Sequence, residues 1–193
     1  IGGIGCGAWA TTIANKLAQN NHQVIIWCHS EDIAKDINHH QINKACLPDF
    51  KLNKGISATA DLSVSIKNAE IIVIGVASNF ISIVEDMDSK DLKNKPILML
   101  TKGTLDHPNY RYISEYVKNV LPENPVAKLS GPNLALEISE NKLASTVIAS
   151  SDISSARLCK TCLESDTFSV YISDDIKGVE LGGILKNIYA IAA

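Results

Sequence analysis

The first 28 residues carry the pattern that most restricts how this chain can fold. Residues 1–4 form a short apolar segment that runs directly into the sequence Gly5-Cys6-Gly7-Ala8-Trp9-Ala10. Small and apolar residues then recur at helical spacing through residues 10–18, and a second apolar run occupies residues 24–28. An apolar run, a glycine turn, a helix and another apolar run together predict a βαβ unit with two parallel strands.

The spacing within the turn, G-x-G-x-x-A, predicts a ligand as well as a fold. Gly5 permits the tight turn, Gly7 lets the backbone approach a pyrophosphate, and Ala10 lets the helix lie close to the strand. The free N–H groups at the start of the helix would then face the anion. We therefore expect a dinucleotide site here; the alternative is a tight turn between strand and helix that binds nothing.

Beyond residue 28 the chain keeps alternating between apolar runs and helical patterns. Strands are expected at 56–59, 71–76, 96–101, 126–130, 144–150 and 168–173, and helices at 31–39, 61–69, 80–87, 110–121 and 154–163. A proline-containing loop is expected at 47–50. The alternation predicts an α/β fold, a doubly wound and mostly parallel Rossmann-type sheet over residues 1–174.

The two ends suggest a piece of a longer protein. The chain begins at Ile1 rather than at a methionine, and it stops at Ala193 within a helical pattern that starts near residue 175. We expect residues 175–193 to be the first helix of a truncated, helical C-terminal substrate domain.

Composition excludes several classes of protein. A net charge of −3 gives no basic footprint for nucleic acid, and no apolar run is long enough to span a membrane. No secretory signal is visible. Five scattered cysteines suit a reducing compartment, so a cytoplasmic location is expected. Cys159-x-x-Cys162 has no partner pair or nearby histidine, so we expect it to pack in a helix and predict no metal site.

Ligands of open parallel sheets bind at the carboxyl ends of the strands. Those ends are followed by the glycine turn and by Cys28-His29-Ser30, Ala77-Ser78-Asn79, Thr101-Lys102-Gly103-Thr104 and Ser130-Gly131-Pro132-Asn133. We expect these segments to converge on one crevice. There Lys102 would bind a phosphate or polarise a carbonyl as a point charge; the alternative is a strand-end lysine that reaches solvent.

The last helical segment contains a second lysine in an unusual setting. Gly182 and Gly183 are adjacent, and each costs about 1 kcal/mol relative to alanine inside a helix. Helical spacing puts them on one face with Lys186 and Ala190, with Asn187 beside them. A groove of small residues that ends in lysine and asparagine would admit a substrate; the alternative is close helix packing, with Lys186 extending outward.

His29 occupies the position at which dinucleotide folds contact the adenosine ribose. The strand that precedes it ends without an aspartate or glutamate, the residue that favours NAD, so NADP is also possible. The alternative for His29 is a solvated loop histidine.

Six landmarks in order resemble the NAD(P)-dependent glycerol-3-phosphate dehydrogenase family, over essentially the whole chain. They are Gly5-Cys6-Gly7-Ala8-Trp9-Ala10, Asn20-Asn21-His22-Gln23-Val24 leading to Trp27, Cys46-Leu47-Pro48, Thr101-Lys102-Gly103, Ser130-Gly131-Pro132-Asn133-Leu134-Ala135-Leu136-Glu137 and Leu181-Gly182-Gly183-Ile184-Leu185-Lys186-Asn187. The resemblance implies interconversion of dihydroxyacetone phosphate and sn-glycerol 3-phosphate with NAD(H) or NADP(H), which feeds glycerophospholipid synthesis. It also implies a homodimer in the full-length protein.

Matching positions carry roles over from the family. Lys186 is similar to the general acid/base lysine, and Lys102 resembles the lysine shared by substrate and cofactor. By the same resemblance, the remaining substrate contacts are Gly131, Asn133 and Asn187, and the cofactor contacts are Gly5, Gly7, Ala8, Trp9, Ala10, His29, Lys102 and Ala135.

The chain departs from the family pattern at four positions. Ala10 replaces the usual third glycine, Ala8 stands where bacterial members commonly have serine, Ala77 replaces a common proline, and Asn133 stands where threonine or serine is common. The family's aspartate and Thr/Ser-Arg-Asn phosphate grip are absent from these residues.

Three other interpretations remain open. The first is another two-domain dehydrogenase, of the hydroxyacid or 6-phosphogluconate type, against which Thr101-Lys102-Gly103 and Ser130-Gly131-Pro132 argue. The second is a non-catalytic dinucleotide sensor, which would keep the glycine turn but would not need Lys102 or Lys186. The third is a doubly wound scaffold with an empty crevice.

Overall fold

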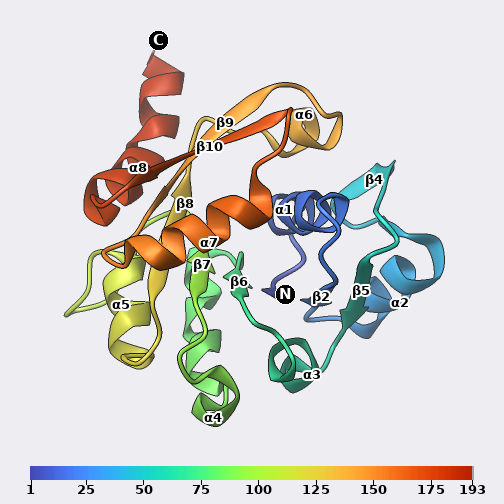
Figure 1. Cartoon of the computed structure of the whole chain (residues 1–193), viewed down its shortest axis with the longest axis horizontal. Coiled ribbons are helices and arrows are strands. Elements are labelled where there is room, and N and C mark those ends of the chain that lie inside the picture. Colours follow the sequence, from blue (N-terminus) through green and yellow to red (C-terminus); the bar gives the residue numbers. More distant parts are fainter. Residues whose placement is uncertain (193) are drawn as a thin grey trace.

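The computed structural model describes residues 1–192, apart from the side chains of residues 187, 188 and 190. An eight-stranded sheet forms the centre, in the order β10-β9-β8-β7-β6-β1-β2-β5 (Figure 1). Its strands are β1 (Gly2–Ile4), β2 (Val24–Trp27), β5 (Ile56–Thr59), β6 (Ile72–Ile74), β7 (Ile97–Met99), β8 (Val126–Ser130), β9 (Ala144–Ala149) and β10 (Phe168–Ser173).

Six of these strands are parallel and make the predicted doubly wound sheet. In chain order, β1, β2, β5, β6, β7 and β8 have the spatial order 3-2-1-4-5-6 of dinucleotide-binding folds. The strand order reverses at β1, because Gly2 pairs with Ile25 of β2 on one side and with Ile72 of β6 on the other. A ligand crevice is expected at this reversal, beyond the carboxyl ends of the strands.

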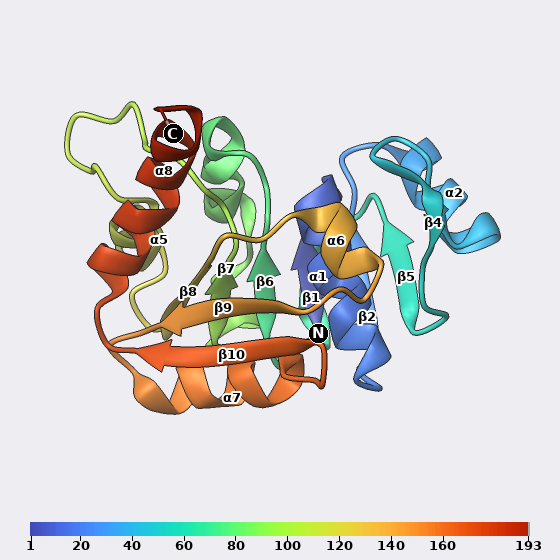
Figure 2. The same ribbon diagram turned by 90° about the horizontal axis from the view of Figure 1, so that it is seen from above.

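The last two strands run the other way. β9 is antiparallel to β8, with Lys128 opposite Ala149, and β10 is parallel to β9 (Figure 2). The chain therefore leaves β10 beside the amino ends of the six parallel strands. Helix α8 (Ile176–Ala192) then packs against β8. Among residues 1–192 no helix combines the length and hydropathy of a transmembrane span.

Helices cover both faces of the sheet and enclose two apolar cores. One face is covered by α1 (Ala8–Gln19), α2 (Glu31–His40), α6 (Ala135–Ser139) and α7 (Ile153–Leu163). The other is covered by α3 (Leu62–Lys67), the 3-10 helix η1 (Ser78–Asp86), α4 (Ser89–Leu92) and α5 (Ile113–Val120). Strands β1, β6 and β7 are buried throughout, as expected for a parallel sheet covered on both sides.

One local expectation was wrong. The segment expected to be a loop at 47–50 forms β4 (Leu47–Lys51), which pairs with β3 (Ile42–Asn43) in an antiparallel hairpin. Pro48 is compatible with it because a two-stranded hairpin leaves edge positions that need no N–H donor. The helical segment expected at 80–87 is present as the 3-10 helix η1, whereas the sequence did not predict α4 or α6.

Candidate functional site

The glycine turn packs against the backbone that directly follows β6. Gly5 has φ = +111°, and a Cβ there would lie 2.9 Å from the carbonyl oxygen of Gly75. Gly7 differs, because a Cβ at Gly7 would meet no atom within 4 Å. No described side chain caps α1, for which Gly7 is the N-cap residue. The first N–H groups of the helix therefore remain available to an anion.

Ala10 holds α1 against the sheet, as its position in the motif predicted. A Cβ added to Gly75 would lie only 2.7 Å from the Cβ of Ala10. Gly75, directly after the neighbouring strand β6, thus leaves the space that the methyl group of Ala10 occupies. This explains how alanine is accommodated where the family commonly has glycine.

Gly75→Ala is therefore expected to destabilise the fold by about 1–3 kcal/mol, the usual range for an overpacked contact. Ala10→Gly in the same chain should restore part of the loss, because it removes the facing methyl group. Urea unfolding measures both. Gly182→Ala is the matched control, since a Cβ there meets nothing within 4 Å. Equal stability of Gly75→Ala and Gly182→Ala would contradict the close contact.

Two cavities meet at the glycine turn. One, of about 510 Å³, runs over Gly5, Gly7 and His29. The other, of about 340 Å³, shares Gly7 with the first and is lined by the remaining residues of the predicted cofactor site: Ala8, Trp9, Ala10, Lys102 and Ala135, together with Asn133. We call the two together the groove. Every predicted cofactor contact lines it.

Lys102 turns inward rather than into solvent. Its Nζ lies 5.4 Å from the centre of the Trp9 ring and donates a hydrogen bond of 3.4 Å to the carbonyl oxygen of Gly131. Burial lowers the pKa of Lys102, and the positive charge of nearby Lys186 lowers it further. The positive charge of Lys102 therefore lies at one end of the groove, where an anion would be stabilised.

The two adjacent glycines of α8 have different surroundings. A Cβ on Gly183 would lie 2.5 Å from Ser130 Oγ, so this glycine permits close packing, whereas Gly182 faces open space. Lys186 and Gly131 line a small cavity of about 230 Å³ between α8 and the end of β8. The predicted contacts at Asn187 and Ala190 lie outside the described side chains.

Two buried polar atoms of the groove have no partner among the described residues. Trp9 Nε1 is a donor without an acceptor, and Asn133 Oδ1 is an acceptor without a donor. The amide nitrogen of Asn133 donates to the carbonyl oxygen of Ser145 at 2.7 Å, which orients the side chain. Buried polar groups are rarely left unsatisfied, so both atoms fit a polar ligand such as a dinucleotide.

The sequence analysis missed a buried ion pair beneath this end of the groove. Lys128 Nζ and a carboxylate oxygen of Glu180 are 3.9 Å apart, and both side chains are 1 % exposed. Lys128 also donates to the carbonyl oxygen of Thr101, and Glu180 accepts from the amide of Ile113 at 3.0 Å. Burial lowers the pKa of Lys128 to about 8, although Glu180 opposes the shift. A lysine within the apolar strand sequence VAKLS was the available signal.

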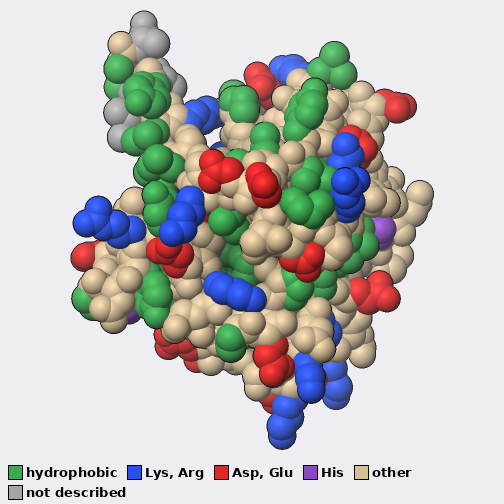
Figure 3. All heavy atoms as spheres, turned by 60° about the vertical axis from the view of Figure 1, so that its left-hand side comes forward, with side chains coloured by type: hydrophobic (Ala, Val, Ile, Leu, Met, Phe, Trp, Pro, Cys, Tyr) green, Lys and Arg blue, Asp and Glu red, His purple; other side chains and the backbone are tan. Residues whose placement is uncertain are grey.

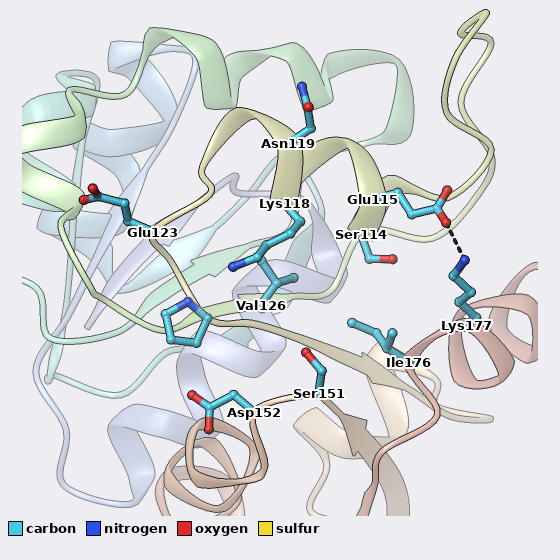
Figure 4. A pocket seen from close by; sticks show the side chains of 11 residues that line it. Ser114, Glu115, Lys118, Asn119, Glu123, Val126, Ser151, Asp152, Ile176 and Lys177 are labelled. Carbon is cyan, nitrogen blue, oxygen red and sulfur yellow. Dashed lines mark ion pairs between the residues drawn. The ribbon is translucent and has the colours of Figure 1, made fainter.

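A further cavity, of about 560 Å³, contains none of the predicted residues. It lies between α5, the start of β8 and the start of α8, and its walls include the Glu115–Lys177 ion pair of 2.7 Å (Figure 4). This cavity lies at the amino ends of the parallel strands, whereas the glycine turn lies at their carboxyl ends. Within residues 1–192, no group of three or more His, Cys, Asp or Glu side chains could hold a metal ion.

Comparison with known proteins agrees with this geometry. Residues 1–156 match the family model of the NAD-dependent glycerol-3-phosphate dehydrogenase N-terminus. Glycerol-3-phosphate dehydrogenase [NAD(P)+] of Pseudomonas savastanoi pv. phaseolicola is 35% identical over 190 residues, which are 98% of this chain and 55% of that protein. The enzyme of that name from Acinetobacter baumannii strain SDF is 37% identical over 189 residues, 98% of this chain and 53% of that protein.

The fold agrees as well. The crystal structure of glycerol-3-phosphate dehydrogenase from Coxiella burnetii superposes with a TM-score of 0.89 at 31% identity, over 99% of this chain and 59% of that one. The chain spans about half the length of the curated relatives it matches. It belongs to the NAD(P)-dependent glycerol-3-phosphate dehydrogenase family and corresponds to the N-terminal part of its members.

Proposed function

We propose that this chain binds NAD(H) or NADP(H) in the groove and forms the cofactor-binding part of an enzyme that interconverts dihydroxyacetone phosphate and sn-glycerol 3-phosphate. The observation that carries the proposal is a groove whose floor is an uncapped helix start and which Lys102 lines, with Lys186 lining the small cavity beside Gly131, the residue that Lys102 contacts. A dinucleotide sensor needs that helix start but has no need of Lys102 or Lys186.

Different residues of the groove would bind different parts of the dinucleotide. The N–H groups at the start of α1 would hold the pyrophosphate, and the unpartnered Trp9 Nε1 would donate to it. His29 would lie beside the adenosine, and Ala135 along the groove towards Lys102. When bound, the dinucleotide supplies or accepts the hydride.

The two lysines would supply a proton and a positive charge to the substrate. Lys186 would donate a proton to the carbonyl oxygen of the substrate during reduction, and accept it during oxidation. Lys102 would stabilise the negative charge that develops on the same oxygen. Gly131, Asn133 and Asn187 would position the substrate, and the free acceptor Asn133 Oδ1 suits one of its hydroxyl groups.

The residues after β2 bear on the choice between NAD(H) and NADP(H). Glu31 and Asp32 fall in the first turn of α2, after the Ser30 cap, and both are exposed. No carboxylate directly follows β2 to bind ribose hydroxyls, so both cofactors belong in the test.

We further propose a division into a cofactor domain, residues 1–174, and the opening helix of a substrate domain, residues 175–193. Helix α8 projects from the body and carries exposed apolar side chains, among them Leu181, Tyr189 and Ile191 (Figures 1 and 3). We also propose a cytoplasmic homodimer that contributes to glycerophospholipid synthesis. The five free thiols support a reducing compartment.

The test uses the complete protein that contains this sequence. NADH and NADPH are titrated by tryptophan fluorescence, which is suitable because Trp9 and Trp27 both line the groove. Oxidation of each cofactor is then followed with dihydroxyacetone phosphate. Saturable binding and substrate-dependent oxidation are expected. Binding without oxidation would favour a sensor or a related dehydrogenase, and absence of binding would overturn the proposal.

A further inference from the structure

The carbonyl oxygen of Cys6, in the middle of the glycine turn, accepts hydrogen bonds from three described side chains. Asn43 Nδ2 donates to it at 2.8 Å, Thr11 Oγ1 at 3.2 Å and Cys46 Sγ at 3.4 Å. Asn43 Nδ2 also donates to Thr11 Oγ1 at 3.0 Å, so these groups form one connected network. A carbonyl oxygen has two lone pairs, and the thiol is a weak donor, so Asn43 and Thr11 are its principal partners.

The β3–β4 hairpin brings two of these donors to the turn. Asn43 ends β3, and the amide of Cys46 donates to the carbonyl oxygen of Asn43 at 3.2 Å, which closes the connection between the two strands. Thr11 comes from the first turns of α1, and both Thr11 and Asn43 are fully buried. None of these three side chains has a role in the function proposed above.

The network fixes the direction of the peptide between Cys6 and Gly7. This peptide is trans, so its C=O and N–H groups point in opposite directions. Because the oxygen is held towards buried Thr11 and Asn43, the N–H of Gly7 points away from them. Gly7 is exposed and lines both cavities of the groove. Hydrogen bonds to the oxygen also polarise the peptide, which makes its N–H group a stronger donor.

We propose that Asn43, together with Thr11, is a positioning residue for the dinucleotide pyrophosphate and acts by fixing the Cys6–Gly7 peptide at the entrance to α1. Asn43 lines neither cavity of the groove, so its effect is transmitted through the carbonyl of Cys6. A peptide that is already oriented loses less conformational freedom when the anion binds. The inference rests on the proposed dinucleotide site.

The other atom of the Asn43 amide separates this role from simple packing of the hairpin. Asn43 Oδ1 is buried and has no hydrogen-bond partner among the described residues. An unpaired buried acceptor is unfavourable, and an apolar side chain would fill the same space without it. The two donations from Nδ2 to the glycine turn and α1 are therefore the feature that only the amide supplies.

The first test is Asn43→Leu in the complete protein, because leucine keeps the branched shape but cannot donate. The Kd for NADH and for NADPH, followed by tryptophan fluorescence, should rise about 10- to 100-fold, the range for loss of a hydrogen bond to a charged group. Asn38→Leu is the matched control. Asn38 exchanges two hydrogen bonds of 2.8 Å with the backbone of Ala58, away from the turn, so its loss should lower stability to urea but leave Kd unchanged. Equal Kd values for the two variants would overturn the inference.

Two variants of Thr11 separate orientation of the peptide from packing. Thr11→Val keeps the shape of the side chain but loses the hydroxyl group, whereas Thr11→Ser keeps the hydroxyl group and loses the methyl group. We expect Thr11→Val to raise the dinucleotide Kd about tenfold and Thr11→Ser to retain most of the affinity. The reverse order would show that packing alone matters and would overturn the inference. Absence of dinucleotide binding by the unaltered protein would instead refute the proposed function, and this inference with it.

Discussion

Lys186→Met is expected to lower kcat about 10²- to 10⁴-fold in the complete protein while leaving the Kd for dinucleotide unchanged. Methionine keeps the length and most of the volume of the side chain but cannot hold or donate a proton. Lys186 lines the cavity beside Gly131 rather than the glycine turn, so cofactor contacts should survive its loss. Initial rates with dihydroxyacetone phosphate measure kcat, and fluorescence titration measures Kd.

The same helix offers a matched control. Lys177 lies at the start of α8 and pairs with Glu115 beside the cavity at the amino ends of the parallel strands, far from the groove (Figure 4). Lys177→Met removes one positive charge from α8 without touching the proposed site, so kcat should not change. A similar kcat for the two variants would show that Lys186 acts only through helix charge or packing and would refute the proton-transfer role.

Glu180→Ala is expected to destabilise the fold by about 3–5 kcal/mol, the usual cost of breaking a buried ion pair by removing one partner. The change leaves the buried ammonium of Lys128 without its counter-charge and the amide of Ile113 without its acceptor. Because Glu180 joins α8 to the start of α5, both helices should loosen together. Urea unfolding of the complete protein gives the free energy.

A double variant tests whether the cost comes from the unpaired charge. Lys128→Met with Glu180→Gln removes both charges and keeps their volume and an acceptor for Ile113, so it should recover most of the lost stability. Together with the single variants Lys128→Met and Glu180→Gln, the double variant completes a double-mutant cycle. If the double variant is as unstable as Glu180→Ala, packing rather than charge holds the helices together.

The ion pair also predicts a dependence of stability on pH. The pKa of Lys128 is about 8 in the folded state and near 10.5 in an unfolded chain, so between these values the unfolded state binds a proton that the folded state has lost. The free energy of unfolding contributed by this group therefore rises with pH across that window, and the contribution is lost as pH falls towards 8. The double variant should lack the rise. An identical pH profile would contradict the assignment to Lys128.

Local patterns in the sequence were sufficient for the architecture around the groove. Helical spacing after Gly5-Cys6-Gly7 and the apolar runs 71–76 and 96–101 depend on residues close in the chain, and a sheet buried on both faces leaves strand sequences apolar. The crevice at the strand ends followed from topology alone, because parallel strands present their carboxyl ends at one edge. The glycine turn and a crevice at the strand ends could thus be predicted from local patterns, whereas the direction of Lys102 at its strand end stayed open.

Contacts between residues that are far apart in the sequence could not be predicted from local patterns. Helical spacing placed Gly182 and Gly183 together, yet only Gly183 packs closely, because only it faces Ser130 across the gap to β8. Residues 47–50 form a strand because a partner strand lies beside them, although Pro48 favours a loop. In both cases the pairing partner determined the outcome.

The sequence by itself determined a doubly wound dinucleotide fold with a glycine turn and two lysines at strand and helix ends, because periodicity and turn chemistry are local. Only the tertiary structure decided that Lys102 turns inward towards Trp9 and Gly131, and that Lys128 and Glu180 pair beneath this end of the groove. Each of these contacts joins residues 29 to 93 positions apart, whose contact energy appears only when the sheet has formed. Burial then turns such contacts into shifted pKa values and fixed charges, which no local pattern encodes.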